Sequence, residues 1–121
     1  MANAINWFEI PAKDFERGCK FYSSLFGADL YKMDMNGYMM GFFPAEKGVG
    51  GAIVSGEGME PSQSGVMVYL NGGEDLSGML AKVEPAGGKV VVPKTQVTPE
   101  IGFFAVFIDT EGNKVAMHSP K

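Results

Sequence analysis

Two stretches of the chain, DFERGCKFYSSLFG (14–27) and DLSGMLAKVEPAGG (75–88), decide the fold, and they lie 61 positions apart. Each begins with an aspartate that can cap a helix and ends on a glycine, the residue favoured just past a helix end. Between these ends, apolar or small residues recur at i, i+3, i+4 and i+7, the spacing of one helical face. The two faces consist of Phe15, Gly18, Cys19 and Tyr22, and of Leu76, Met79, Leu80 and Val83. We therefore predict an internal duplication with one helix per copy, capped by Asp14 and Asp75.

Short apolar runs flank each helix in the same order, one before it and three after it. Asn36-Gly37 between two such runs is a strong signal for a tight hairpin, and 109–113 is a second turn-rich cluster. The expected strands are 5–10, 28–35, 38–43 and 51–54 in the first copy, and 66–70, 89–92, 102–108 and 114–118 in the second. This pattern predicts an α+β fold of two tandem βαβββ modules that form a curved mixed sheet with a central cleft and the helices on the outside.

The length of 121 residues suits one domain, because domains usually hold roughly 100–200 residues. We expect a single domain over 1–121, with module 1 at about 1–55, a polar loop at 56–64 and module 2 at about 65–121. About sixty residues with one helix leave one face of a sheet uncovered. We therefore expect the two modules to fold together.

Composition and charge exclude several classes of protein. Ten basic residues against fourteen acidic ones give a net charge of −4, which disfavours binding to nucleic acid. A single cysteine rules out an internal disulfide framework. We expect no signal peptide, because the first residues lack a basic flank and a sustained apolar run, and no apolar run approaches the roughly 20 residues that span a bilayer. We expect a cytoplasmic protein that has neither a nucleic acid nor a membrane as partner.

The opening INWFEIPAKD (5–14), with Phe21-Tyr22 and Leu25-Phe26-Gly27 in the predicted helix, resembles the first module of the vicinal oxygen chelate superfamily. The ending FIDTEGNKV (107–115) resembles the C-terminal hairpin of that superfamily. The superfamily includes glyoxalase I, extradiol dioxygenases, and bleomycin- and fosfomycin-resistance proteins. Because its members share a scaffold and not a substrate, the resemblance implies the fold and leaves the reaction open.

The resemblance also implies where a metal would be held, because the superfamily's enzymes place His or Glu ligands on the first and last strands of each module. Here Trp7, Met67 and Ala116 stand at three of those positions, and the fourth falls near Gly51 or Ala52. Indole, thioether and methyl groups cannot replace imidazole and carboxylate as ligands of a divalent metal. We expect no metal centre of the family type and no cofactor.

Strand alternation points these same positions into the predicted cleft, together with further apolar residues. The expected ligand-binding residues are Trp7, Met67, Tyr69, Ala116, Phe42 and Phe103. Alternation leaves two choices open: Tyr38, Met40 and Phe42 or their neighbours face inward, and either the set that contains Phe103 or the set that contains Phe104 does so. Trp7 suits both a stacking platform for a planar ligand and a core aromatic that fills the place of the metal. Tyr69 likewise suits two roles, packing in the core or a hydrogen bond to a ligand.

Glu9 and His118 are the candidate catalytic pair. A carboxylate in an apolar cleft and a histidine that titrates near neutrality can act together as general acid and base. In the alternative interpretation, Glu9 forms a salt bridge with a basic neighbour and His118 lies near a frayed C-terminus. The sequence leaves open whether the protein is an enzyme.

Three functions are consistent with these observations. The first is metal-free binding of a small, partly aromatic molecule in an apolar cleft. The second is a metal-dependent lyase, isomerase or dioxygenase of the glyoxalase I or extradiol dioxygenase type. The third is a resistance protein that sequesters an antibiotic between two subunits. The resemblance and the exposed sheet edges also predict a homodimer.

Overall fold

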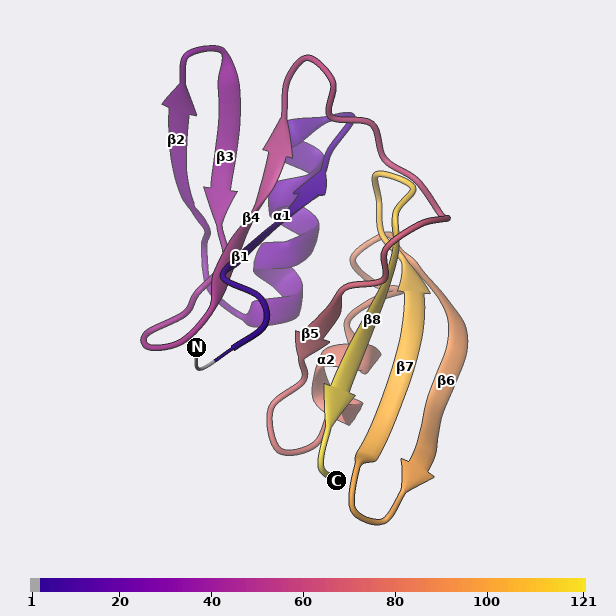
Figure 1. Ribbon diagram of the computed structural model, residues 1–121. Coiled ribbons are helices and arrows are strands. Elements are labelled where there is room, and N and C mark those ends of the chain that lie inside the picture. The colour runs from indigo at the N-terminus through magenta and orange to yellow at the C-terminus, as the bar shows by residue number, and fades with distance from the viewer. Residues whose placement is uncertain (1–2) are drawn as a thin grey trace.

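The computed structural model describes residues 3–121, whose helices and strands repeat in the order that the duplication predicts (Figure 1). The first module contains β1 (Trp7–Pro11), α1 (Phe15–Phe26), β2 (Tyr31–Met35), β3 (Tyr38–Phe42) and β4 (Gly50–Ser55). The second contains β5 (Tyr69–Asn71), α2 (Ser77–Ala81), β6 (Lys89–Thr98), β7 (Gly102–Ile108) and β8 (Lys114–Ser119). The predicted α+β class with two βαβββ modules is confirmed.

Each module forms its own four-stranded mixed sheet. Sheet A has the order β1-β4-β3-β2, and sheet B repeats it as β5-β8-β7-β6. In each sheet the first pair is parallel and the other two pairs are antiparallel. Within residues 3–121, no strand pairing joins the two sheets, so the eight strands form two adjacent sheets.

Helix α1 begins and ends as its sequence predicts. Asp14 is extended (φ −119°, ψ 105°), and its Oδ1 accepts a 3.1 Å hydrogen bond from the Arg17 amide. Gly27 adopts a left-handed conformation (φ 69°), and its amide donates to the Ser23 carbonyl at 2.8 Å. The buried face of α1 consists of Phe15, Gly18, Cys19, Phe21, Tyr22 and Leu25.

The prediction for the second helix is wrong at its start and in its length. α2 covers five residues, and Leu76 rather than Asp75 occupies the N-cap position. Asp75 Oδ1 instead accepts from the Ser77 amide at 2.9 Å and from Lys94 Nζ at 2.8 Å. Gly78 lies inside α2, where glycine disfavours the helical state by about 1 kcal/mol relative to alanine. The apolar face is nevertheless formed, because Leu76 and Val83 are completely buried.

The strands differ from prediction mainly at their ends. β5 covers 69–71, where 66–70 was predicted, although the Val68 carbonyl still accepts from the Ala116 amide at 2.9 Å. β6 extends to Thr98, well beyond the predicted 89–92. The predicted Asn36-Gly37 hairpin is confirmed: both residues have positive φ (55° and 92°), as a two-residue type I′ turn requires.

One hydrophobic core includes residues of both modules. Figure 1 shows α1 behind sheet A. The ring centroids of Phe21 on this helix and of Phe107 on β7 are 5.9 Å apart. The Asn113 side chain donates to the Pro11 carbonyl at 2.7 Å, which joins the start of β8 to the end of β1. Among residues 3–121, no helix is long and apolar enough to cross a membrane.

Candidate functional site

One face of sheet A packs under α1, and the other face, here called the open face, is exposed. Ile10 is buried in the core and Phe8 packs against it, whereas Trp7 and Glu9 lie on the open face, as strand alternation predicts. The register of β2 with β3 places the aromatic and methionine side chains of both strands on this face, except Met39, which packs against the core. The open face carries Trp7, Glu9, Tyr31, Met33, Met35, Tyr38, Met40 and Phe42.

Three aromatic rings follow one another across the open face. The Trp7 and Phe42 ring centroids are 5.9 Å apart, and those of Phe42 and Tyr31 are 6.0 Å apart. Trp7 and Tyr31 remain 42% and 68% exposed, so large areas of both rings are available for contact. The Trp7 Nε1 donates to Glu9 Oε2 at 3.2 Å and holds a carboxylate beside the aromatic rings.

A depression of about 370 Å³ lies on this face next to Glu9. The Glu57 and Met59 side chains from the loop after β4 form its rim, and the Tyr38 hydroxyl holds this loop by donating to the Glu57 carbonyl at 3.0 Å. Its remaining lining is Met35, Tyr38, Met40 and Val54. Glu57 and Met59 were not predicted as site residues. They belong to a polar loop without periodicity, and only the fold brings them to the sheet.

In sheet B, the predicted ligand-binding residues do not share one exposed face. Tyr69 is 57% exposed and pairs with Ala116, which is completely buried. Phe104 is the cross-strand neighbour of His118 in the register of β7 with β8. Phe103 lies on the opposite face, where it packs against the core with the Lys94 ammonium 4.8 Å above its ring.

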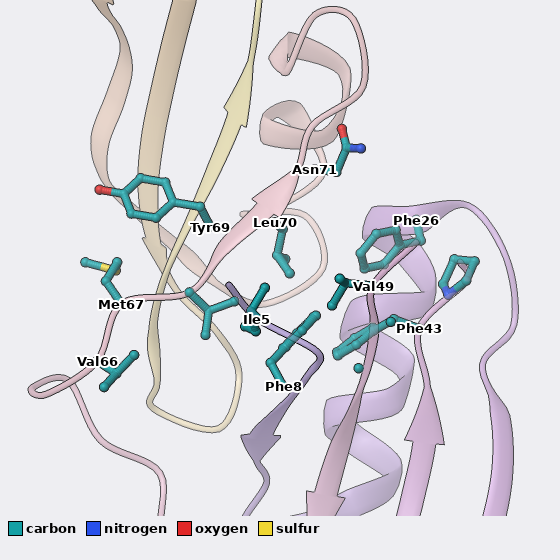
Figure 2. Close-up of a pocket in the computed structure, with 14 residues that line it drawn as sticks. Ile5, Phe8, Phe26, Phe43, Val49, Val66, Met67, Tyr69, Leu70 and Asn71 are labelled. Atoms are coloured by element: carbon teal, nitrogen blue, oxygen red, sulfur yellow. The ribbon is translucent and has the colours of Figure 1, made fainter. Parts of the chain in front are cut away.

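A second hollow, the junction groove, lies between the modules and has a volume of about 380 Å³ (Figure 2). Phe8, Phe26 and Phe43 line its module 1 side. The module 2 side is the segment 66–71, in which Leu70 faces Phe8 while Met67 and Tyr69 point to the other side of the segment. The groove thus brings Met67 and Tyr69 close to the start of β1, but its lining does not include Trp7, Phe42 or Ala116.

Glu9 and His118 are not brought together. Glu9 lines a small pocket with Asn113 and Lys114 at the start of β8, whereas His118 lies near the other end of that strand. A His118 ring nitrogen, Nε2, lies 2.6 Å from the Ile101 carbonyl, which can only accept, so Nε2 carries the proton and donates. Glu9 accepts from Trp7 instead of forming the salt bridge considered in the alternative interpretation.

The residues present do not fit the divalent metal that the resemblance implies. The positions in question carry indole, thioether and methyl groups, none of which is a ligand for such an ion. In the described part of the chain, no three His, Cys, Asp or Glu side chains cluster in a way that could hold a metal ion. Cys19, the free cysteine, is buried on α1, and burial raises the pKa of its thiol to about 11.

Comparison with known proteins agrees with this architecture. The family model described as "Glyoxalase/Bleomycin resistance protein/Dioxygenase superfamily" matches residues 4–117. A glyoxylase-like domain-containing protein of Didymella fabae is 35% identical over 122 residues, which cover 93% of this chain and 91% of that protein.

Solved structures with the same fold include enzymes and binding proteins. TnmS3, an antibiotic binding protein from Streptomyces sp. CB03234, is 26% identical with a TM-score of 0.70, covering 100% of this chain and 99% of its own. The E144Q mutant of glyoxalase I from Zea mays is 18% identical with a TM-score of 0.70, and the match covers 95% of this chain but 44% of the maize chain. On the family match and the fungal relative, the chain belongs to the glyoxalase/bleomycin resistance protein/dioxygenase superfamily.

Proposed function

We propose that this protein binds a small, partly aromatic molecule on the open face of sheet A, without a metal ion of the family type. The observation that carries the proposal is the exposed row of Trp7, Phe42 and Tyr31 beside the depression at Glu9. Soluble proteins rarely leave large apolar areas exposed unless these areas bind something. Aromatic rings with centroids about 6 Å apart offer extended area for contact with a planar ring that lies against them.

The depression combines this apolar area with a few polar groups, as ligand sites usually do. Its two carboxylates, on Glu9 and Glu57, accept hydrogen bonds and attract positive charge. Three methionines in its lining, Met35, Met40 and Met59, can adjust their shape to irregular ligands. The ligand class favoured here is therefore a planar aromatic compound that carries hydrogen-bond donors or a cationic group.

The similarity to TnmS3 supports binding without turnover, because that protein is described as an antibiotic binding protein and matches over the full length of both chains. Antibiotic sequestration is accordingly the specific form of the function that we favour second. Expression in a sensitive bacterium, with protection and no chemical change of the drug, distinguishes sequestration from catalysis. Stoichiometric zinc, nickel or iron in purified protein would instead support the metal-dependent lyase, isomerase or dioxygenase.

The sole tryptophan, Trp7, makes the binding test direct. A panel of planar aromatic compounds, neutral and cationic, is titrated into the protein while the tryptophan emission is followed. We expect quenching by a member of the panel, and a Phe42→Leu variant should weaken that ligand about 2- to 12-fold, the value of one aromatic pair. Phe103→Leu is the matched control, because Phe103 lies on the other side of its sheet. Equal weakening by both variants, or no quenching by any compound, contradicts the proposal.

A further inference from the structure

β2 and β6 occupy equivalent outer edges of sheets A and B, but they differ in how accessible they are to another strand. β6, the edge of sheet B, contains Pro93 and shifts its register against β7 between Val92 and Thr95. Proline and bulges are common means of blocking an edge strand. β2, the edge of sheet A, pairs in regular register with β3 over all five residues and contains no proline (Figure 1).

The hairpin register determines which backbone groups of β2 point outward. Met35 and Tyr38 flank the two-residue turn and form a hydrogen-bonded pair, so Met33 and Tyr31 also bond to β3. The amides and carbonyls of Lys32 and Asp34 therefore point away from β3, along the free edge. Every residue of β2 is exposed, so this edge is accessible to another strand.

We propose that β2 pairs antiparallel with β2 of a second copy of this chain, around a two-fold axis at Met33. This register brings the outward groups of Lys32 opposite those of the partner's Asp34, and the reverse, which completes the hydrogen bonds of both strands. The same pairs place opposite charges face to face, an arrangement that stabilises cross-strand neighbours. The segment YKMDM (31–35) is thus complementary to itself in charge as well as in backbone pattern.

The side chains on the open face support the same partner. Tyr31, Met33 and Met35 are 68%, 38% and 46% exposed in one chain. In the proposed register, Tyr31 lies opposite the partner's Met35 and Met33 lies opposite the partner's Met33. Contacts between methionine sulfur and an aromatic ring are favourable, and pairing joins the apolar stripes of the two chains into one continuous face. On the α1 side, Lys32 already binds Glu16 at 2.7 Å, which holds its ammonium on the face where the partner's Asp34 lies.

Disulfide cross-linking tests the register directly. Residues at the axis of such a pair have Cα atoms about 4.5 Å apart, within the range that a disulfide bridges. Two copies of position 35 are separated by four residue steps of roughly 3.4 Å, beyond that range. We expect Met33→Cys to form a covalent dimer under mild oxidation and Met35→Cys not to. The native Cys19 is buried and does not compete. A Met33→Cys variant that stays uncrosslinked, or cross-linking at position 35 alone, overturns the proposal.

Charge reversal tests it independently. The wild-type chain should sediment at twice its 13.0 kDa mass, and both Asp34→Lys and Lys32→Glu should raise the dimer Kd by about tenfold or more. Mixing these two variants restores opposite charges in both pairs, so a heterodimer should form. Gln96→Lys on β6 is the matched control and should leave the dimer intact, since that edge is blocked. A wild-type monomer at every concentration, or a mixture that stays monomeric, overturns the interface.

Discussion

The Tyr22 hydroxyl of α1 donates a 2.7 Å hydrogen bond to Asp109 Oδ2 in the turn before β8, and both residues are buried. Burial, and then the charge of Asp109, raise the pKa of Tyr22 well above its ordinary value, so the phenol keeps its proton and remains a donor. Asp109 also accepts from the amides of Glu111 and Asn113 and from the Asn113 side chain. One buried carboxylate thus joins the helix of module 1 to the final hairpin of module 2.

Removing the Tyr22 hydroxyl should loosen this connection. Tyr22→Phe leaves the ring in the core but deprives Asp109 Oδ2 of one donor, so we expect a loss of about 1–3 kcal/mol in the free energy of unfolding. Urea denaturation followed by circular dichroism measures it. Tyr31→Phe, at an exposed tyrosine, should change the free energy by less than about 0.5 kcal/mol. Equal stability of Tyr22→Phe and wild type would show that the hydrogen bond contributes nothing.

Glu111 should make stability depend on acid. Burial alone would raise the pKa of Glu111, but hydrogen bonds from the Arg17 side chain, the Asp14 amide and the Thr110 hydroxyl outweigh it and lower that pKa. A carboxyl group whose pKa is lower in the folded state stabilises that state at any pH above its unfolded pKa, which is about 4.3 for glutamate. This stability is lost as the pH falls through the lower pKa of the folded state. The unfolding midpoint should therefore decrease as the pH falls below about 4.3.

The variant Glu111→Gln should be less stable at pH 7 and should show a flatter pH dependence than wild type. Thermal unfolding between pH 7 and pH 3 compares the two slopes. Glu16→Gln is the control, since Glu16 pairs with Lys32 on the surface and such pairs contribute little. A Glu111→Gln slope equal to that of wild type would assign the acid sensitivity to other carboxylates.

Two glycines should respond in opposite directions to substitution by alanine. A Cβ at Gly41 would lie 2.7 Å from Cys19 Sγ and 3.1 Å from Ile53 Cγ2, so Gly41→Ala should destabilise the protein by about 1–3 kcal/mol through overpacking. A Cβ at Gly78, inside α2, would meet nothing within 4 Å. Gly78→Ala should therefore stabilise the protein by up to about 1 kcal/mol. Denaturant midpoints of both variants check these signs, and a stabilising Gly41→Ala would contradict the tight packing of α1 on sheet A.

Cys19 should resist thiol reagents in the folded protein. Its pKa of about 11 leaves little thiolate at pH 8, and its side chain is buried. Ellman's reagent should react slowly with native protein and quickly in 6 M urea, as followed by absorbance at pH 8. Equally fast reaction in both conditions would mean that α1 opens readily from sheet A.

Much of this architecture could be predicted from local patterns. Asp14 and Gly27 each act within one helical turn, so their roles as cap and stop follow from neighbouring residues alone. Asp75 has the same sequence signal, yet Lys94, 19 positions later, binds its carboxylate and Leu76 takes the cap position. The spacing of apolar residues along the chain cannot predict such competition between groups that are distant in the sequence.

Some residues of the candidate site could likewise be predicted from local patterns, and others could not. Alternation along β1 was enough to place Trp7 and Glu9 on one face, because successive strand residues point to opposite sides. Alternation could not choose between Phe103 and Phe104, since both belong to one uninterrupted apolar run, 103–108. Nor could it indicate that the loop containing Glu57 and Met59 folds back over the open face.

The sequence by itself determined the duplication and the order of helices and strands. It also determined that the family's ligand positions lack metal-binding side chains. Each of these features depends only on which residue types occur at fixed spacings along the chain. Only the tertiary structure decided that Glu9 and His118 lie near opposite ends of β8, that the lining of the junction groove includes Met67 but not Trp7, and that every residue of the edge strand β2 is exposed. The reason is physical: these relationships depend on how two sheets pack around one shared core, and no single segment contains the atoms that set that packing.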